Sequence, residues 1–497
     1  MGLLKRNLVA NLAGTLWSGL LTLALVPIYV RLLGIEAFGL IAFQATLAAA
    51  MALFDAGLGV TTNRELARLS ATPGAVAESR VVARSIETTY WGIALTVGAI
   101  LLALTPLLAS RWLNAQQIPI SLSTQAMALA VAGIALQFPF TFYSAGLLGL
   151  QQHVKLNAIL VTGTTIRAAG SIVLLTTIST DLRLLFAWHA VAGLLQTIAA
   201  AIALHRALPP GEGRFDAAVL RRAFRFSRGV ALSGTLGFAA MQIDKLAVSK
   251  LLPLSTFGYY SIAGMIATAV GLAVTPVQST VFPLFSQLVA RNDTEGFSRA
   301  YHRATQTVAG ILLPLAAVAI LFAREIVFLW TRDANVAREA RWVAVLLVTG
   351  VMLNALSHIS HVLQLAHGWT APAVVANALQ LVAIVPLTLM AIQRYGAVGA
   401  AAVWAVLQAS FLIISLSVTH SRTLRGEMRA WLLRDVGPPL CAVFAVALAG
   451  KALLGSVPRA DVLALSIALI ASGVFVAGAL STPVVREWLK ERWRSRW

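Results

Sequence analysis

Long apolar stretches recur along the chain and are separated by short polar connections. A helix needs about 20 apolar residues to cross a hydrocarbon core of roughly 30 Å, whereas the strands of a membrane barrel alternate over about 10 residues. The stretches therefore predict an all-α integral membrane protein with about 14 transmembrane helices. The first stretch exceeds the apolar core of a signal peptide, about 7–15 residues, and is expected to remain as a helix. The predicted spans cover residues 8–31, 39–62, 86–109, 122–148, 156–178, 184–205, 227–250, 257–288, 303–330, 342–366, 371–393, 397–419, 436–455 and 461–482.

The chain contains an internal repeat. RLLGIEAFG at 31–39 aligns with KLLPLSTFG at 250–258, an offset of 250 − 31 = 219, and AGTL at 13–16 and SGTL at 233–236 agree with that offset to within one residue. Parallel repeats are a transporter architecture in which the substrate site lies near the repeat interface. We expect two six-helix bundles of the same orientation, two additional helices and a basic tail. The boundaries are 1–207 for the first bundle, 208–226 for a cytoplasmic linker, 227–420 for the second bundle and 421–497 for the rest.

Composition and charge support a membrane protein. Of the 497 residues, 59% are hydrophobic and 11% are charged, and the formal net charge is +19. The basic residues are spread over many connections, so no single basic domain for nucleic acid is present. Cytoplasmic connections collect Lys and Arg, which predicts that both termini are cytoplasmic. The connections assigned to the cytoplasm include those with Arg291, Arg299 and Arg303, whereas the basic outer segment around Arg332 is an exception.

Several stretches resemble a known family: PIYVRLLGIEAFGL, FDAGLG, NRELA, IDKLAVSKLLPLSTFGYYSIA, VFPLFSQL and ILLPLAAVAILFAREIVFLW. Through about residue 420 the chain resembles the polysaccharide transporters, or Wzx-type flippases, of the multidrug/oligosaccharidyl-lipid/polysaccharide exporter superfamily. The resemblance implies a bacterial inner-membrane protein that moves an undecaprenyl-pyrophosphate-linked oligosaccharide to the periplasmic leaflet by alternating access. Such transport would serve O-antigen, capsule or exopolysaccharide biosynthesis.

Three other functions compete with this one. Lipid II flippases of the same superfamily typically carry arginine in the first helix, which is uncharged here from Leu8 to Val30. A multidrug or cation antiporter would favour acidic cavity residues, whereas the deep charges here are mostly basic. A membrane glycosyltransferase or polymerase needs acid/base or metal-binding groups, and the outer loop around residues 332–341 offers only Asp333 and Glu339. We therefore expect a transporter that is not an enzyme and has no cofactor.

The expected partners follow from this reading. They are the anionic lipid-linked oligosaccharide, the phospholipid membrane, H⁺ or Na⁺ as a coupling ion, and polysaccharide polymerase machinery, with no nucleic acid. Cys441 is the only cysteine, so an intramolecular disulfide and a cysteine metal site are excluded.

Asp244 and Lys245 are opposite charges in the apolar seventh span. Neighbours on a helix are about 100° apart, so the two side chains cannot share a face. Lys245 aligns with Gln242, and both are candidates for the substrate cavity. Asp244 is a candidate for ion coupling, or for a salt bridge to another helix. Lys245 is also close enough to the end of its span to snorkel to the interface.

Arg167 lies in the middle of the fifth span, with Thr164 and Ser171 on the same face. A guanidinium binds phosphate through a fork of donors, so we predict that Arg167 lines a cationic substrate cavity. The structural alternative is a salt bridge to Asp55 or Asp244.

The remaining candidates occur in two groups. Asp55, Arg31 and Arg64 lie near the ends of the first two spans and are candidates for gating. Asn354, His358 and His361 follow one face of the tenth span and must turn inward, toward a cavity or a neighbouring helix. Two imidazoles without a third ligand do not make a metal site, so none is predicted.

Overall fold

The computed structural model describes residues 3–72, 76–211, 213–224, 241–369, 371–454 and 459–494. The chain forms two compact units, Met1–Gly258 and Tyr259–Trp497. Within the described residues, 11 helices are long and apolar enough to cross a membrane, or 12 when one bent helix pair is counted as a span. The prediction of an all-α integral membrane protein is therefore confirmed.

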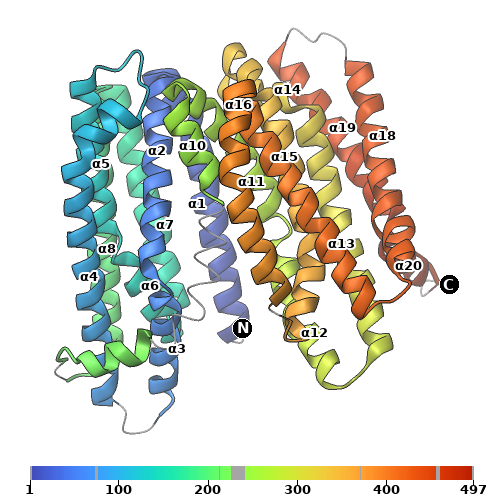
Figure 1. Ribbon diagram of the computed structural model, residues 1–497, viewed down its shortest axis with the longest axis horizontal. Coiled ribbons are helices and arrows are strands. Elements are labelled where there is room, and N and C mark those ends of the chain that lie inside the picture. Colours follow the sequence, from blue (N-terminus) through green and yellow to red (C-terminus); the bar gives the residue numbers. More distant parts are fainter. Residues whose placement is uncertain are drawn as a thin grey trace. The chain divides into compact units, whose positions relative to one another are not determined.

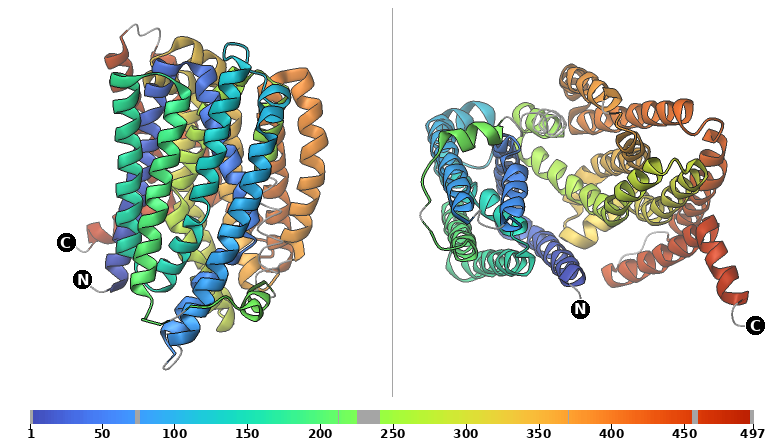
Figure 2. Two further views of the ribbon diagram at one scale, coloured as in Figure 1. Left: turned by 90° about the vertical axis from the view of Figure 1, so that its left-hand side faces the viewer. Right: turned by 90° about the horizontal axis from the view of Figure 1, so that it is seen from below.

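The first unit is a bundle of long helices that pack side by side, both between consecutive helices and between helices distant in sequence. α4 packs against α5, α5 against α8, and α7 against both α8 and α1 (Figure 1; Figure 2, left). The helices are α1 (Leu3–Leu33), α2 (Ile35–Met51), α3 (Leu58–Ser70), α4 (Val76–Leu107), α5 (Ile120–Gln137), α6 (Phe140–Gly149), α7 (His153–Val173), α8 (Leu182–Ala207) and α10 (Ile243–Leu251).

One predicted span in this unit was too long. The second was expected over residues 39–62, but α2 ends at Met51 and, after a short 3₁₀ turn, α3 begins at Leu58. Ala56 and Gly57, between them, have left-handed backbone angles, with φ of 47° and 77°. An α-helix cannot continue through such angles. The apolar character of the stretch continues past this break, which is why periodicity did not reveal it.

The second unit contains the remaining helices. α11 (Leu254–Leu272), which starts at the end of the first unit, and α12 (Thr275–Ala290) are bent by 46° relative to each other. The others are α13 (Thr294–Leu321), α14 (Ala323–Thr331), α15 (Ala334–Ala366), α16 (Ala371–Arg422), α17 (Met428–Ala430), the π-helical turn η4 (Trp431–Val436), α18 (Gly437–Leu454), α19 (Ala460–Ser481) and α20 (Pro483–Arg494).

α16 accounts for part of the difference between the observed and predicted numbers of spans. At 52 residues it would be about 78 Å long as a straight helix, far more than a bilayer core of roughly 30 Å. Gly396 breaks it with φ 58° and ψ −142°, between the predicted spans 371–393 and 397–419. The predicted seventh span, 227–250, lies largely outside the described residues, so the total of about 14 stays a prediction.

The two repeated motifs pack on each other through glycines. A Cβ at Gly39 would lie less than 3.0 Å from the carbonyl oxygen of Leu254, and a Cβ at Gly258 would lie less than 3.0 Å from that of Ile35. The contact is reciprocal, because 258 − 39 and 254 − 35 both equal the repeat offset of 219. Backbone oxygens cannot turn aside as a side chain can. Both positions therefore require glycine for close approach.

We expect Gly39→Ala and Gly258→Ala each to destabilise the protein by about 1–3 kcal/mol, the usual cost of overpacking a close contact. The measurement is thermal unfolding of the purified full-length protein in detergent. Gly19→Ala is the matched control, because Gly19 lies in α1 and no heavy atom is within 4 Å of the place where its Cβ would stand. Unchanged unfolding temperatures for both motif variants would show that the motifs do not need this contact.

Candidate functional site

The most unusual polar group in the first unit is the guanidinium of Arg167, on α7. Its Nε and Nη2 atoms are buried and have no hydrogen-bond partner in the described part of the chain. None of the ion pairs found among the described residues includes Arg167. Burying a charge without a partner lowers the stability of the folded protein. The two donors of this cation are therefore kept available to a ligand at a cost in folding free energy.

Arg183, in the same unit, shows the ordinary behaviour of a surface arginine. Its Nε donates to Asp181 Oδ2 at 2.9 Å, and its side chain is 50% exposed. This contact holds the pKa of the Asp181 carboxyl below its usual value. Arg183 is therefore exposed to solvent and paired with a carboxylate, whereas Nε and Nη2 of Arg167 are buried and have no partner within the described ranges.

Three side chains from three helices form a polar group around Arg167. His189 Nε2 on α8 lies 3.4 Å from the Tyr29 hydroxyl of α1 and 3.2 Å from the Ser171 hydroxyl of α7. Ser171 also donates to the carbonyl oxygen of Arg167 at 2.8 Å, as does Trp188 Nε1 at 3.0 Å. The backbone at Arg167 is thus fixed from two sides while the end of its side chain is not.

The guanidinium packs closely against Gly193 of α8. Arg167 Nη2 and Gln137 Oε1 each lie 3.3 Å from the place where a Cβ would stand on Gly193. Gln137 Nε2 in turn donates to Gln196 Oε1 at 3.3 Å. The absence of a side chain at residue 193 therefore lets the guanidinium and the Gln137 amide pack closely against α8. The guanidinium is the group of this pair that can bind an anionic oxygen.

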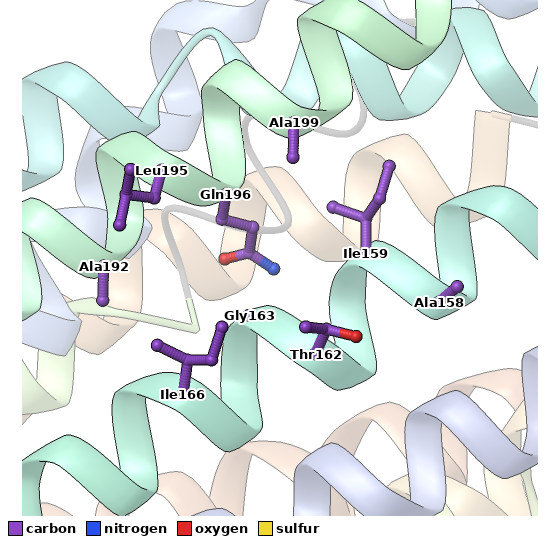
Figure 3. Close-up of a pocket in the computed structure, with 9 residues that line it drawn as sticks. All are labelled: Ala158, Ile159, Thr162, Gly163, Ile166, Ala192, Leu195, Gln196 and Ala199. Atoms are coloured by element: carbon purple, nitrogen blue, oxygen red, sulfur yellow. The ribbon is translucent and has the colours of Figure 1, made fainter.

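Gln196 connects this polar cluster to a groove between α7 and α8. The groove has a volume of about 260 Å³ and is lined mainly by apolar side chains, among them Ile159, Ile166 and Leu195. Figure 3 shows the Gln196 side chain pointing from α8 toward Gly163 on α7. A Cβ at Gly163 would lie 2.7 Å from Gln196 Cδ, so glycine is what admits the amide here. Tyr29, Gln137, Arg167, Ser171, His189 and Gln196 are called the Arg167 cluster below.

The charges of the predicted seventh span lie at the start of α10. Lys245 Nζ donates to Gln242 Oε1 at 3.1 Å, which is the pairing expected from their spacing. Asp244 is buried, with 5% of its surface exposed. The far end of α10 is held by Trp112, whose Nε1 donates to Ser249 Oγ at 3.1 Å. The structure thus brings Gln242 and Lys245 together.

The three gating candidates lie on three different elements: Arg31 on α1, Asp55 in the 3₁₀ turn after α2, and Arg64 on α3. Asp55 accepts hydrogen bonds from the Tyr90 hydroxyl and from the backbone N–H of Gly59 at 3.2 Å, so it stabilises the start of α3. Arg31 is exposed in the last turn of α1, and Arg64 is exposed on α3. The contacts of Asp55 are structural, and none of them is the predicted salt bridge to Arg167.

In the second unit, the polar face of α15 turns toward α16. Asn354 Nδ2 donates to Gln408 Oε1 at 3.0 Å, and the His361 ring lies 6.1 Å from that of Phe411. The His358 and His361 rings are 6.2 Å apart. The sequence left open whether these residues face a cavity or a neighbouring helix. Asn354 contacts a neighbouring helix. No group of His, Cys, Asp or Glu suited to a metal ion occurs in the described residues.

Sequence reasoning missed a polar network in the first unit. Glu87, on α4, accepts from the Tyr143 hydroxyl at 2.7 Å, lies 3.0 Å from His205 Nε2 and pairs with Arg84 at 3.3 Å. Glu87 is only 5% exposed. Its signal was a carboxylate inside the predicted span 86–109, directly after the start of that span.

A second missed network lies in the second unit and involves His302, on α13. Its Nδ1 contacts Asp435 and its Nε2 lies 2.8 Å from Glu427 Oε2. Gln306 donates to Asp435 Oδ1 at 2.7 Å. Because 306 − 87 equals 219, Gln306 occupies the position that the repeat assigns to Glu87. Equivalent places in the two repeats thus carry buried polar networks.

Solved structures of membrane transporters share this fold. Lipid II flippase MurJ in an inward closed conformation superimposes with a TM-score of 0.73, at 12% identity, over 97% of this chain and 100% of that one. An inward-facing multidrug resistance MATE family transporter of the MOP superfamily gives 0.68, at 16% identity, over 82% and 94%. At these identities the likeness is one of fold. It is the fold of a multi-pass membrane protein.

The family follows from the sequence match. A model described as polysaccharide biosynthesis protein matches residues 4–289, and one described as MatE matches residues 230–390. The chain belongs to the polysaccharide biosynthesis protein family, and its resemblance to Wzx-type polysaccharide transporters is confirmed. A Shigella flexneri protein named as an O-antigen transporter is 22% identical over 186 residues, 37% of this chain. That match covers 44% of the length of the relative.

Proposed function

We propose that this protein is a flippase that translocates an undecaprenyl-pyrophosphate-linked oligosaccharide across the bacterial inner membrane by alternating access. It would serve O-antigen, capsule or exopolysaccharide biosynthesis. The observation that carries the proposal is the buried Arg167 guanidinium, two of whose donors have no hydrogen-bond partner among the described residues of this member of the polysaccharide biosynthesis protein family. A pyrophosphate must lose its hydrating water molecules to cross the bilayer. A buried guanidinium can replace the hydrogen bonds that this water provided.

The Arg167 cluster has the chemistry that such a head group needs. A guanidinium forms charge-assisted and forked hydrogen bonds with phosphate oxygens. The neighbouring amides and hydroxyls of Gln137, Gln196 and Tyr29 can each donate to or accept from sugar hydroxyls. The chain contributes binding and orientation, and the transported molecule leaves with all its covalent bonds unchanged. In this proposal the protein is not an enzyme and needs no cofactor.

The direction of transport requires an orientation and an energy source. We place both termini in the cytoplasm, as the distribution of basic connections predicts. Asp244 is the proposed coupling carboxylate for H⁺ or Na⁺, because it is a buried acid beside the Gln242–Lys245 pair. Lys245 and Gln242 are proposed to meet the substrate, together with His358 and His361 of the second unit. Polymerase machinery is a proposed partner on the periplasmic side.

In cells that lack this protein, we expect the lipid-linked oligosaccharide to accumulate on the cytoplasmic face and surface polysaccharide to be lost. The measurement is the fraction of lipid-linked glycan that an external glycan-modifying reagent reaches in intact spheroplasts. Supplying the gene should restore it. Unchanged surface glycan in a deletion strain without a second transporter would overturn the proposal.

Two other transport functions have a specific observation behind them. The MatE match and the MATE fold likeness favour a multidrug or cation antiporter, and efflux of a fluorescent cation by proteoliposomes tests it. The fold likeness to a lipid II flippase favours that substrate instead. Rescue of a strain depleted of its own lipid II flippase tests whether this protein transports lipid II. Arg167 argues against the multidrug or cation antiporter, because a buried cation repels cationic drugs.

A further inference from the structure

A second groove lies in the second unit, between α12 and α13. It has a volume of about 730 Å³ and adjoins the part of the bundle where a short turn joins the two helices (Figure 1, yellow-green segment at the lower edge). One wall is apolar and follows α12 through Val277, Val281, Leu284 and Leu288. The other wall is α13. The groove therefore has an apolar wall along α12.

Two arginines on α13 line the same groove. Arg299 and Arg303 are four residues apart, so their side chains leave the same face of the helix. Arg299 has only a loose surface contact, 3.9 Å from Glu295, with both side chains more than 70% exposed. Arg303 is exposed, and none of the ion pairs found among the described residues includes it. The groove thus has an apolar wall and a pair of available cations.

We propose that this groove is a docking site for the polyprenyl diphosphate part of the transported lipid before translocation. The inference rests on the proposed function and adds a second binding place, separate from the Arg167 cluster. The diphosphate would contact Arg299 and Arg303, and the polyprenyl chain would lie along the apolar wall of α12. Arg299 and Arg303 belong to a connection that the charge distribution assigns to the cytoplasm, which is the face where the proposed substrate is supplied.

The chemistry favours this occupant over a membrane phospholipid. Two guanidiniums one helical turn apart match two linked phosphoryl groups, whereas a phosphodiester such as phosphatidylglycerol presents one negative charge. The lining residues found in the described part of the chain come from α12 and α13, so the apolar wall and the two arginines face each other across one groove. A free diphosphate would meet the arginines but would leave the apolar wall uncovered.

The test is binding of a photoactivatable farnesyl diphosphate to the full-length protein in nanodiscs, read by crosslinking and mass spectrometry. We expect the probe to label α12 or α13, and the variant Arg299→Ala/Arg303→Ala to bind it at least tenfold more weakly. Arg291→Ala is the matched control, since Arg291 ends α12, is exposed and does not line the groove. It should bind as the wild type does.

Competition distinguishes the possible occupants. Undecaprenyl diphosphate should displace the probe, whereas phosphatidylglycerol at the same concentration and inorganic pyrophosphate should not. Equal binding by the double variant, or displacement by phosphatidylglycerol, would overturn the docking site and leave the proposed function in place. Absence of any specific binding to the wild type would also overturn the docking site, whereas the proposed function is tested separately by the deletion strain.

Discussion

Replacing Arg167 by alanine is expected to reduce transport of the lipid-linked oligosaccharide by about 100-fold or more. Two charge-assisted hydrogen bonds contribute about 1.5–3 kcal/mol each, and about 1.4 kcal/mol corresponds to a factor of ten. Arg167→Lys should retain part of the activity, because the charge remains while the forked geometry is lost. The measurement is translocation in proteoliposomes, normalised to the amount of folded protein.

The stability of the same position separates a binding role from a structural one. Arg167→Met removes a buried charge whose Nε and Nη2 have no hydrogen-bond partner in the described residues. We expect this variant to lose transport but to unfold at the same temperature as the wild type or at a higher one. Functional sites commonly reduce the stability of the folded protein, so removing them often stabilises it. Arg183→Ala, at a paired and exposed arginine of the same unit, is the control and should transport normally. A transport-competent Arg167→Met protein would remove Arg167 from the site.

Replacing His302 by alanine is expected to destabilise the protein by about 3 kcal/mol, because a buried hydrogen bond to a charged group contributes about 1.5–3 kcal/mol, while Asp435 keeps Gln306 and Arg434 as partners. Asp435 is fully buried, and His302 lies between it and Glu427. His302 is on α13, whereas Asp435 belongs to η4, directly before α18. The contact therefore attaches the additional C-terminal helices to the rest of the second unit.

The measurement is thermal unfolding of the purified protein, with Asp435→Asn as a second variant. The asparagine side chain would keep a hydrogen-bond acceptor for Gln306 and lose the charge, so its effect should be smaller than that of His302→Ala. Glu339→Ala is the surface control, because the Arg338–Glu339 pair is exposed in the same unit and such pairs contribute little. A His302→Ala protein as stable as the control would show that the network does not hold these helices.

Sequence and structure agree best on where the helices are. The apolar runs were identified from residue type alone, and each of the described spans overlaps one or two of them. The break after Met51 and the missed networks are the failures. His302 and Asp435 stood one residue before the predicted spans at 303 and 436, and so were counted with the polar connections. An acid or histidine at such a boundary can face water or a neighbouring helix, and spacing does not distinguish these cases.

The site was predicted in part. The placement of Arg167 and the alignment of Lys245 with Gln242 follow from helical spacing, and the Lys245–Gln242 hydrogen bond agrees with it. The roles of these residues in transport stay predictions. The alternative salt bridge from Arg167 to Asp55 required knowledge of which helices are neighbours. In the structure Asp55 contacts Tyr90, 35 residues away, and Arg167 is surrounded by α1 and α8.

The sequence by itself determined the membrane class, most spans, the repeat and the family, because each depends on residue type and on spacing along one segment. Only the tertiary structure decided which polar groups have partners. Arg167 without a carboxylate in the described residues, Gly39 against the carbonyl of Leu254 and His302 against Asp435 all depend on helices distant in sequence. Their energies come from burial and from distances of a few ångströms. These are fixed when helices pack, and no local pattern encodes them.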